Sequence, residues 1–309
     1  MLNWTGEMSF RFINIEKLLK NTFFWNQKSD SFHAIWKPSP DQYLYNPSSK
    51  TTESCFKIPI LEKLEKLPKL LWPVFEKCLL ELQVDYAIEC GAKRVFLNTH
   101  FQAQKIHDYV SERGLEIEVL YEESLLDIGG AVHNLAGTLN YEGKILILNG
   151  DQFLFLSNSE FKEINSISTN YVVTLLGLPV PANSDYNELV LENNILKSIS
   201  SPSAKDYYTY SGVSVVNLEK LRPVNGKTKF FDSVANFKEQ EIYVVKPSSF
   251  EYWDFGTTTR YIDSMRKVLT SEKSLFKNFL IRNKSFIEKK VIENDCYNAT
   301  GTKYSISLD

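Results

Sequence analysis

Strand-like and helix-like segments alternate between residues 94 and 150, and this alternation leaves few folds open. Two strand-like segments are "RVFLNTHF" and "EIEVLYEE", and a third is "KILILNG". The segments between them, "QAQKIHDYVSERG" and "GGAVHNLAGTL", have the apolar spacing of helices. The order strand, helix, strand, helix, strand predicts parallel strands joined by right-handed crossovers. We therefore expect an α/β fold.

Further segments extend this pattern in both directions. Upstream, "KCLLELQVDYAIECG" is typical of an amphipathic helix that ends at Gly91. Downstream, "YVVTLLGL", "YTYSGVSVVN" and "EIYVVKP" are typical of strands separated by polar loops, and residues 258–290 have a mostly helical pattern. Together these segments predict a Rossmann-like three-layer fold with a mainly parallel, mixed sheet.

The first 56 residues are harder to interpret, because Pro, Ser, Asn and Asp crowd "KPSPDQYLYNPSSKTTES" and no clean period survives. We expect a divergent N-terminal segment over residues 1–56 that contains the first strand, with "SFHAIW" at 31–36 as its candidate. The main α/β domain is predicted over residues 57–270, and a C-terminal helix and tail over residues 271–309.

Composition narrows the class of partner. The 309 residues carry a net charge of −3 and no basic block, which argues against nucleic acid or an anionic membrane as the partner. No run approaches 18 apolar residues, and the first residues, "MLNWTGEMSF", lack a signal-peptide pattern. The four cysteines form no C-x-x-C pair, which is typical of free thiols in a reducing compartment. We expect a cytoplasmic protein that acts on small molecules.

The end of the third strand offers a candidate ligand. Ile145 to Leu148 form an apolar run without polar alternation, as in a strand buried on both faces, and Asn149, Gly150 and Asp151 follow it. Ligands of open α/β sheets bind outside the carboxyl ends of strands, but Asn-Gly-Asp is also an ordinary turn sequence. Asp151 is thus either a turn residue or a ligand.

Five stretches resemble those of the sugar-1-phosphate nucleotidyltransferases. "LPKLLWPVFEKCLLE" is similar to the lysine segment of that family, and "GAKRVFLNTHFQAQKI" to the strand and helix that follow it. "EESLLDIGGAV" resembles the loop that holds the base, and "LNGD" the metal-binding strand end. "YWDFGTTTRYIDSM" resembles the later metal-binding motif, W-x-D-x-G-T-P-x-x-Y, here with Trp and Asp adjacent. Each motif alone is weak, but their order and intervals are fairly specific.

The resemblance implies the nucleotide-diphospho-sugar transferase type of fold and a reaction. A phosphate oxygen of a sugar 1-phosphate attacks the α-phosphorus of a nucleoside triphosphate, and pyrophosphate leaves. Several negative charges converge on one centre, so Mg²⁺ and fixed cations are needed to offset the repulsion. The implied partners are therefore a nucleoside triphosphate and a sugar 1-phosphate, with Mg²⁺ as cofactor.

The resemblance also assigns roles to individual residues. Asp151 and Asp254 would bind the metal, because Mg²⁺ prefers carboxylate oxygens. Lys69 would place its ammonium on a phosphate as a catalytic cation. The nucleotide-binding residues would be Glu122, Asp127, Gly129 and Gly130, and the sugar-binding residues would be Asn149 and Gly212.

Each assignment has an ordinary structural alternative. Asp254 could be a helix N-terminal residue, and Lys69 a solvated lysine between two prolines. The Glu122 to Gly130 stretch could be a strand-to-helix connection capped by Asp127. Gly212, a single glycine within a strand, could mark a β-bulge.

One family signature is missing. The glycine-rich loop G-x-G-T-R belongs just upstream of the lysine segment, but there is no glycine between Gly6 and Gly91, and Arg11 is the only arginine before Arg94. Such a loop cradles a triphosphate with backbone N–H groups, which glycine makes possible at low cost. Lys57 is the candidate replacement cation and is assigned to the catalytic set, although a lysine lacks the bidentate fork of an arginine.

Three functions stay open from the sequence. The first is an active sugar-1-phosphate nucleotidyltransferase, which the two aspartates favour. The second is a degenerate homologue that binds a nucleotide sugar or a partner subunit without turnover, which the missing loop favours. The third is a glycosyltransferase of related architecture, whose D-x-D signature is absent. A homo-oligomer is possible, and neither the base nor the sugar is readable.

Overall fold

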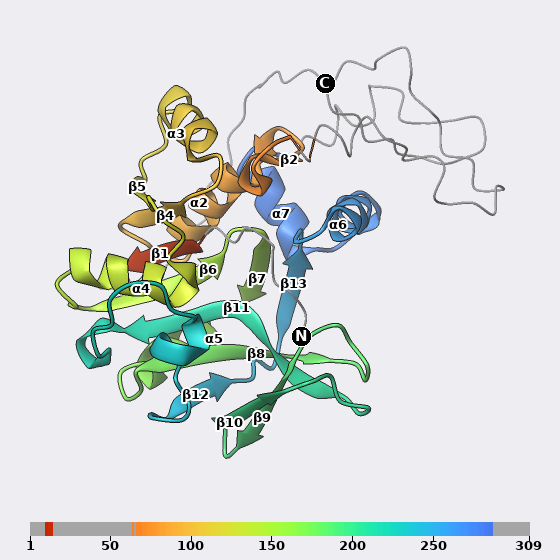
Figure 1. Ribbon diagram of the computed structural model, residues 1–309. Coiled ribbons are helices and arrows are strands. Elements are labelled where there is room, and N and C mark those ends of the chain that lie inside the picture. Colours follow the sequence, from red (N-terminus) through yellow and green to blue (C-terminus); the bar gives the residue numbers. More distant parts are fainter. Residues whose placement is uncertain (1–9, 15–63, 65, 287–309) are drawn as a thin grey trace, which may run out of the picture. The chain divides into compact units, whose positions relative to one another are not determined.

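The computed structural model describes residues 10–14, 64 and 66–286, and these divide into two compact units (Figure 1). Unit 1 contains the described residues 10–14 and 83–253. Unit 2 contains the described residues 64, 66–82 and 254–286. Each unit is described by itself below. The sequence domains expected at 1–56, 57–270 and 271–309 remain predictions.

Unit 1 is built on a nine-stranded sheet in the order β5-β4-β1-β6-β11-β8-β12-β10-β9 (Figure 1). The strands are β1 (Phe10–Asn14), β4 (Val95–Thr99), β5 (Glu118–Tyr121), β6 (Lys144–Asn149), β8 (Val173–Val180), β9 (Glu188–Glu192), β10 (Ile195–Ser200), β11 (Tyr207–Asn217) and β12 (Ile242–Val245). The expected strands at 94–101, 116–123, 144–150, 171–178, 208–217 and 241–247 are therefore all present.

The sheet is mixed, as predicted. Following the antiparallel and parallel pairings across the sheet, β4, β5, β6, β8, β9 and β12 share one direction, whereas β1, β10 and β11 run against them. Only β4 with β5 and β8 with β12 are adjacent parallel pairs. The reversed strands β1 and β11 flank β6 on its two sides. Most strands thus point one way although most neighbouring pairs are antiparallel.

Helices cover both faces of this sheet. On one face Ala131 and Leu135 of α4 (Asp127–Thr138) join a buried cluster with Ile145 and Ile147. On the other face Leu146 lines a small apolar cavity with residues of α5 (Asn158–Ile167). Successive residues of β6 therefore face opposite helix layers, which is why its apolar run shows no polar alternation. The three-layer prediction is confirmed for unit 1.

The remaining elements lie in both units. They are α2 (Leu79–Glu89), α3 (Ala103–Glu112), β7 (Gln152–Leu156), the 3₁₀ turn η2 (Leu218–Lys220), the π-helical turn η3 (Phe230–Val234), β13 (Phe250–Asp254), the 3₁₀ turn η1 (Lys69–Leu71), β2 (Pro73–Val74), β3 (Lys77–Cys78), α6 (Thr258–Thr270) and α7 (Leu275–Arg282). Strands β13 and β7 pair with each other, as do β2 and β3. In the described part of the chain no helix combines the length and apolar character needed to cross a bilayer.

Some elements were not expected. The stretch expected as a first strand, 31–36, lies outside the described residues, and the place between β4 and β6 is taken by β1. The hairpin of β9 and β10 was missed, although Asn193 and Asn194 both have positive φ, at 50° and 63°, as a two-residue hairpin turn requires. The last residue of β9 and the two turn residues form the sequence "ENN".

Glu160 connects the start of α5 to the segment before β13. It forms a capping box with Ser157, and its Oε1 accepts the backbone N–H groups of Ser248 and Ser249 at 2.8 and 3.2 Å. Burial pushes the pKa of Glu160 upward, but the hydrogen bonds from these serines outweigh it and lower the pKa to about 2. The carboxylate therefore stabilises the fold as long as it is ionised.

We predict that Glu160→Gln lowers the free energy of unfolding at neutral pH by about 1 kcal/mol, the scale of one helix cap. The folded-state pKa lies below the ordinary 4.5, so this stability is present above pH 4.5 and lost as the pH falls toward 2. The difference between the wild type and Glu160→Gln should shrink over that range in urea titrations. Glu163→Gln, an exposed position on the same helix, is the control. An equal effect of both substitutions would contradict the prediction.

Candidate functional site

The loop between β5 and α4 is organised by a buried carboxylate. Glu122 is 3% exposed, and its Oε1 accepts the side-chain amide of Asn98 at 2.6 Å. Its Oε2 accepts the backbone N–H of Leu126 at 3.1 Å. Two donors from the protein thus hold the carboxylate that was assigned to the base. Glu122 therefore connects the loop at Leu126 to Asn98 of β4. No sequence pattern indicated Asn98 as its partner.

The start of α4 has an unusual backbone. Asp127, its first residue, has a φ of 62°, in the left-handed region that residues other than glycine rarely adopt. Such a conformation costs of the order of 1 kcal/mol and persists only where the surroundings hold it. Asp127, which was assigned to the nucleotide with a helix cap as the alternative, therefore lies in a locally strained turn at the start of the helix.

Gly129 and Gly130 pack against the protein's own backbone. A Cβ at Gly129 would lie 2.5 Å from the carbonyl oxygen of Lys229, and one at Gly130 would lie 2.6 Å from that of Gly226. The Gly130 N–H donates to the carbonyl of Thr228 at 3.1 Å. The close approach that the glycines allow is thus used by the segment 226–229. The base-binding role assigned to them remains a proposal.

The glycines give a prediction with a control in the same helix. Gly130→Ala should destabilise unit 1 by about 1–3 kcal/mol, because the new methyl group meets a backbone carbonyl that has little room to move. Gly137→Ala, near the other end of α4, meets nothing within 4 Å and should be neutral or stabilising by up to about 1 kcal/mol. Urea denaturation of both variants measures the difference, and equal stabilities would contradict the packing role.

The two residues assigned to the sugar are brought together. Asn149 ends β6, and its Nδ2 donates to Oε1 of Gln152 at 2.7 Å. Gly212 has a φ of 80° and lies where the β11–β8 register shifts, so it does mark a bulge. A Cβ at Gly212 would overlap the side-chain atoms of both Asn149 and Gln152. Gly212 therefore leaves room for a pair of amides, of which Gln152 was not expected.

Asp151 lies in the turn that joins β6 to β7, at the carboxyl end of β6. Its side chain is half-buried. Both sequence interpretations are compatible with this position, since the residue is in a turn and also at the strand end where ligands bind in this class of sheet. Asp151 belongs to unit 1, whereas Asp254 belongs to unit 2.

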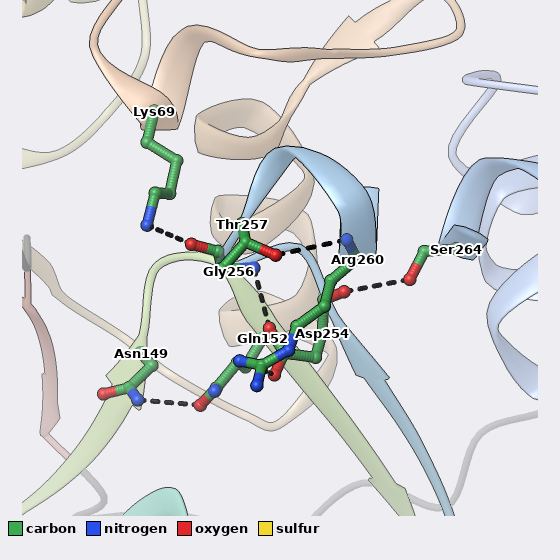
Figure 2. Close-up of polar contacts among 8 residues, drawn as sticks. All are labelled: Lys69, Asn149, Gln152, Asp254, Gly256, Thr257, Arg260 and Ser264. Atoms are coloured by element: carbon green, nitrogen blue, oxygen red, sulfur yellow. Dashed lines mark hydrogen bonds and ion pairs between the residues drawn. The ribbon is translucent and has the colours of Figure 1, made fainter. Parts of the chain in front are cut away.

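In unit 2, the end of β13 and the start of α6 form a compact polar cluster (Figure 2). Oδ1 of Asp254 accepts the backbone N–H of Gly256 at 2.7 Å, and Oδ2 pairs with Nη1 of Arg260 at 3.2 Å. Thr257 is the N-cap of α6 and accepts the backbone N–H of Arg260 at 3.2 Å. The hydroxyl of Ser264 donates to the carbonyl of Asp254 at 2.9 Å.

Lys69 reaches the same cluster from a distant part of the chain (Figure 2). Its Nζ donates to the carbonyl oxygen of Gly256 at 2.7 Å, across 187 positions of sequence. In the same two segments, the hydroxyl of Tyr261 donates to the carbonyl of Pro73 at 2.6 Å, and the rings of Trp72 and Tyr261 meet edge to face at 5.6 Å. The lysine segment and the later aspartate motif are therefore packed together in unit 2.

The contacts of Asp254 do not fit a metal ion on its carboxylate. One oxygen accepts a backbone N–H, and the other already has the positive charge of Arg260 beside it. Among the described residues no three His, Cys, Asp or Glu side chains gather as a metal site would require. Lys57, the candidate replacement cation, lies outside the described residues.

Part of the chain is similar in sequence to known enzymes. A bifunctional sugar-1-phosphate nucleotidylyltransferase/acetyltransferase of Sulfurisphaera tokodaii is 32% identical over 148 residues, which cover 46% of this chain and 34% of that protein. The bifunctional protein GlmU of Thermoanaerobacter pseudethanolicus is 27% identical over 165 residues, 51% of this chain and 35% of its own length. Over about half of its length, the chain is similar to sugar-1-phosphate nucleotidyltransferases. The matched region spans about a third of these relatives' length.

A solved structure agrees with this family in its fold. HddC from Yersinia pseudotuberculosis, complexed with GMP-PN, superimposes with a TM-score of 0.54 at 21% identity and covers 65% of this chain and 90% of HddC. The nucleotide-diphospho-sugar transferase fold expected from the sequence is thus confirmed. No protein-family model matches the chain.

Proposed function

We propose that this chain transfers a nucleotidyl group from a nucleoside triphosphate to a sugar 1-phosphate, giving a nucleoside diphosphate sugar and pyrophosphate. The observation that carries the proposal is the contact between Lys69 and Gly256, which joins two family segments 187 positions apart. Both segments carry residues to which the resemblance assigns a part in the reaction, Lys69 in one and Asp254 in the other. The similarity to the two bifunctional relatives supports the same reaction.

The proposed chemistry needs fixed positive charge. An oxygen of the sugar phosphate forms a bond to the α-phosphorus, and the bond from the α-phosphorus to the bridging oxygen of the β-phosphate breaks, so that pyrophosphate carries the electron pair away. The Gly256 carbonyl holds the ammonium of Lys69 in place, and a cation held in advance stabilises the transition state without reorganisation. Lys57 stays in the proposal as a second cation.

The substrate assignments follow the sequence analysis. The amides of Asn149 and Gln152, with the bulge at Gly212, would form the sugar contact, because amides donate and accept hydrogen bonds as sugar hydroxyls do. The loop from Glu122 to Gly130 would lie at the base, with the strained Asp127 at its turn. The proposal leaves the identity of the base and of the sugar open.

Magnesium enters the proposal as the counter-ion of the triphosphate. Asp151 is the ligand that the resemblance assigns to it from unit 1. Asp254 was assigned the same role, but its present contacts do not fit a metal, so no step is derived from a metal bound there. A cytoplasmic location and a homo-oligomer remain predictions.

A second function is favoured by one observation. The ion pair of Asp254 with Arg260 occupies a carboxylate assigned to the metal, and the sequence lacks the glycine-rich loop. Both features would suit a homologue that binds a nucleotide sugar or a partner subunit without turnover. That protein would keep the binding surfaces of unit 1 and lose the charge arrangement that drives transfer.

We predict that the wild type releases pyrophosphate from at least one pair in a panel of nucleoside triphosphates and sugar 1-phosphates. Lys69→Ala should then lower turnover by about 100-fold or more, because an interaction used mainly in the transition state affects turnover more than binding. Lys66→Ala, an exposed lysine of the same segment, should change turnover by less than about 2-fold. A coupled pyrophosphate assay, with and without Mg²⁺, measures all three proteins.

Binding measurements separate the two functions. Calorimetric titration of nucleotide sugars into the wild type should show binding in either case. Binding without pyrophosphate release from any pair would favour the degenerate homologue. Full activity of Lys69→Ala would remove the observation on which the transferase proposal rests.

A further inference from the structure

Asp254 has a cation built into its own unit. Nη1 of Arg260 lies 3.2 Å from Oδ2, and the two residues are six positions apart, at the end of β13 and in the first turn of α6. Figure 2 shows the guanidinium beside the carboxylate. The pair is therefore formed by two residues that lie close together in the sequence, at a strand end and in the helix turn that follows it.

Both partners are held by further contacts. The Thr257 side chain accepts the backbone N–H of Arg260 and so fixes the start of the helix that carries it. Ser264, two turns into the helix, donates to the carbonyl of Asp254 and fixes the strand end. The carboxylate also accepts the N–H of Gly256. A side-chain pair supported in this way keeps its geometry at little cost in conformational entropy.

The carboxylate of this pair is poorly exposed to solvent. The side chain of Asp254 is 10% exposed and that of Arg260 is 35% exposed, so the carboxylate is largely withdrawn from water while its partner reaches the surface. A poorly solvated carboxylate requires a nearby positive charge. A guanidinium supplies that charge permanently, because arginine does not lose its proton in proteins.

A divalent ion and this guanidinium cannot share the carboxylate without strong repulsion. A metal on Oδ2 would place two positive charges beside the guanidinium, and a metal on Oδ1 would compete with the N–H of Gly256. We propose that Arg260 is the resident cation of Asp254 and stands in for a divalent metal there, so that this aspartate does not bind a metal in the native protein. The inference holds whether or not the chain transfers nucleotidyl groups.

The test measures Mn²⁺ binding by electron paramagnetic resonance, in the absence of substrates. The proposal expects Asp254→Asn to leave the Mn²⁺ affinity of the wild type within about 2-fold. It expects Arg260→Gln to raise that affinity by about 10-fold or more, since the carboxylate loses its competing cation. The double variant Arg260→Gln with Asp254→Asn should lose the gain.

Arg266→Gln is the matched control. Arg266 lies on the same helix and pairs with Asp263 at 3.7 Å, so its replacement removes the same charge from the same element but not from Asp254. Its Mn²⁺ affinity should stay within about 2-fold of the wild type. An equal gain in Arg266→Gln and Arg260→Gln would assign the effect to net charge and overturn the proposal.

Two other outcomes would also overturn it. A loss of Mn²⁺ binding in Asp254→Asn would show that the native aspartate holds a metal beside Arg260. A folded Arg260→Gln, verified by circular dichroism, with unchanged affinity would show that the arginine does not exclude the metal. If Arg260→Gln does not fold, the Asp254→Asn measurement still decides whether the native aspartate binds a metal, and a loss of affinity there overturns the proposal. Pyrophosphate release takes no part in this test, so failure of the proposed function leaves its result intact.

Discussion

The antiparallel ladder between β6 and β11 determines the arrangement of the candidate sugar site in unit 1. Its register pairs Leu148 with Val213, so the next residue of β6, Asn149, meets the next residue back along β11, Gly212. Because side chains alternate between the faces of a sheet, a slip of one residue would send the apolar residues of β6 to the wrong helix layer. The burial of that strand on both faces therefore protects the register, and the register in turn places the Asn149 and Gln152 amides at the bulge.

In unit 2 the main constraint is electrostatic. The carboxylate of Asp254 is largely withdrawn from water, and a positive charge lies beside it. The carboxylate of Asp254 accepts the backbone N–H of Gly256 and pairs with the guanidinium of Arg260. The ammonium of Lys69 donates to the carbonyl oxygen of Gly256. The cationic side chains of Lys69 and Arg260 thus contact Gly256 and Asp254, two residues of the same short turn, in a sequence that lacks the glycine-rich loop and its arginine. In unit 2 the positive charge near the later aspartate motif comes from Lys69 and Arg260. Whether the chain can transfer a nucleotidyl group therefore depends on where these charges lie, and the fold alone does not decide it.

Several residues of the family motifs have packing or hydrogen-bonding roles within the protein itself. Gly129 and Gly130 match the base loop of the family, yet each faces a backbone carbonyl of the segment 226–229, so the fold itself requires them. Glu122 likewise matches the motif, and its carboxylate accepts hydrogen bonds from the Asn98 side chain and the Leu126 backbone. A motif residue can therefore persist because it supports a loop, and a match alone does not tell a ligand contact from the scaffold beneath it.

Local pattern predicted α2, α3, α4, the helical region after residue 258 and most strands, because apolar spacing and turn residues act over a few positions. The helix α5 (Asn158–Ile167) was not expected. Local pattern also placed Asn149 and Asp151 at a strand end, since an apolar run that stops marks the end of a buried strand. Only the tertiary structure decided that β11 runs against β6, that Gln152 and Gly212 meet, and that Arg260 pairs with Asp254. Strand direction and side-chain pairing depend on contacts between residues far apart in sequence or on rotamers chosen by the surroundings. The local spacing of residues in the sequence contains no information about either. The pairing of Asp254 with Arg260 could therefore be known only from the folded chain.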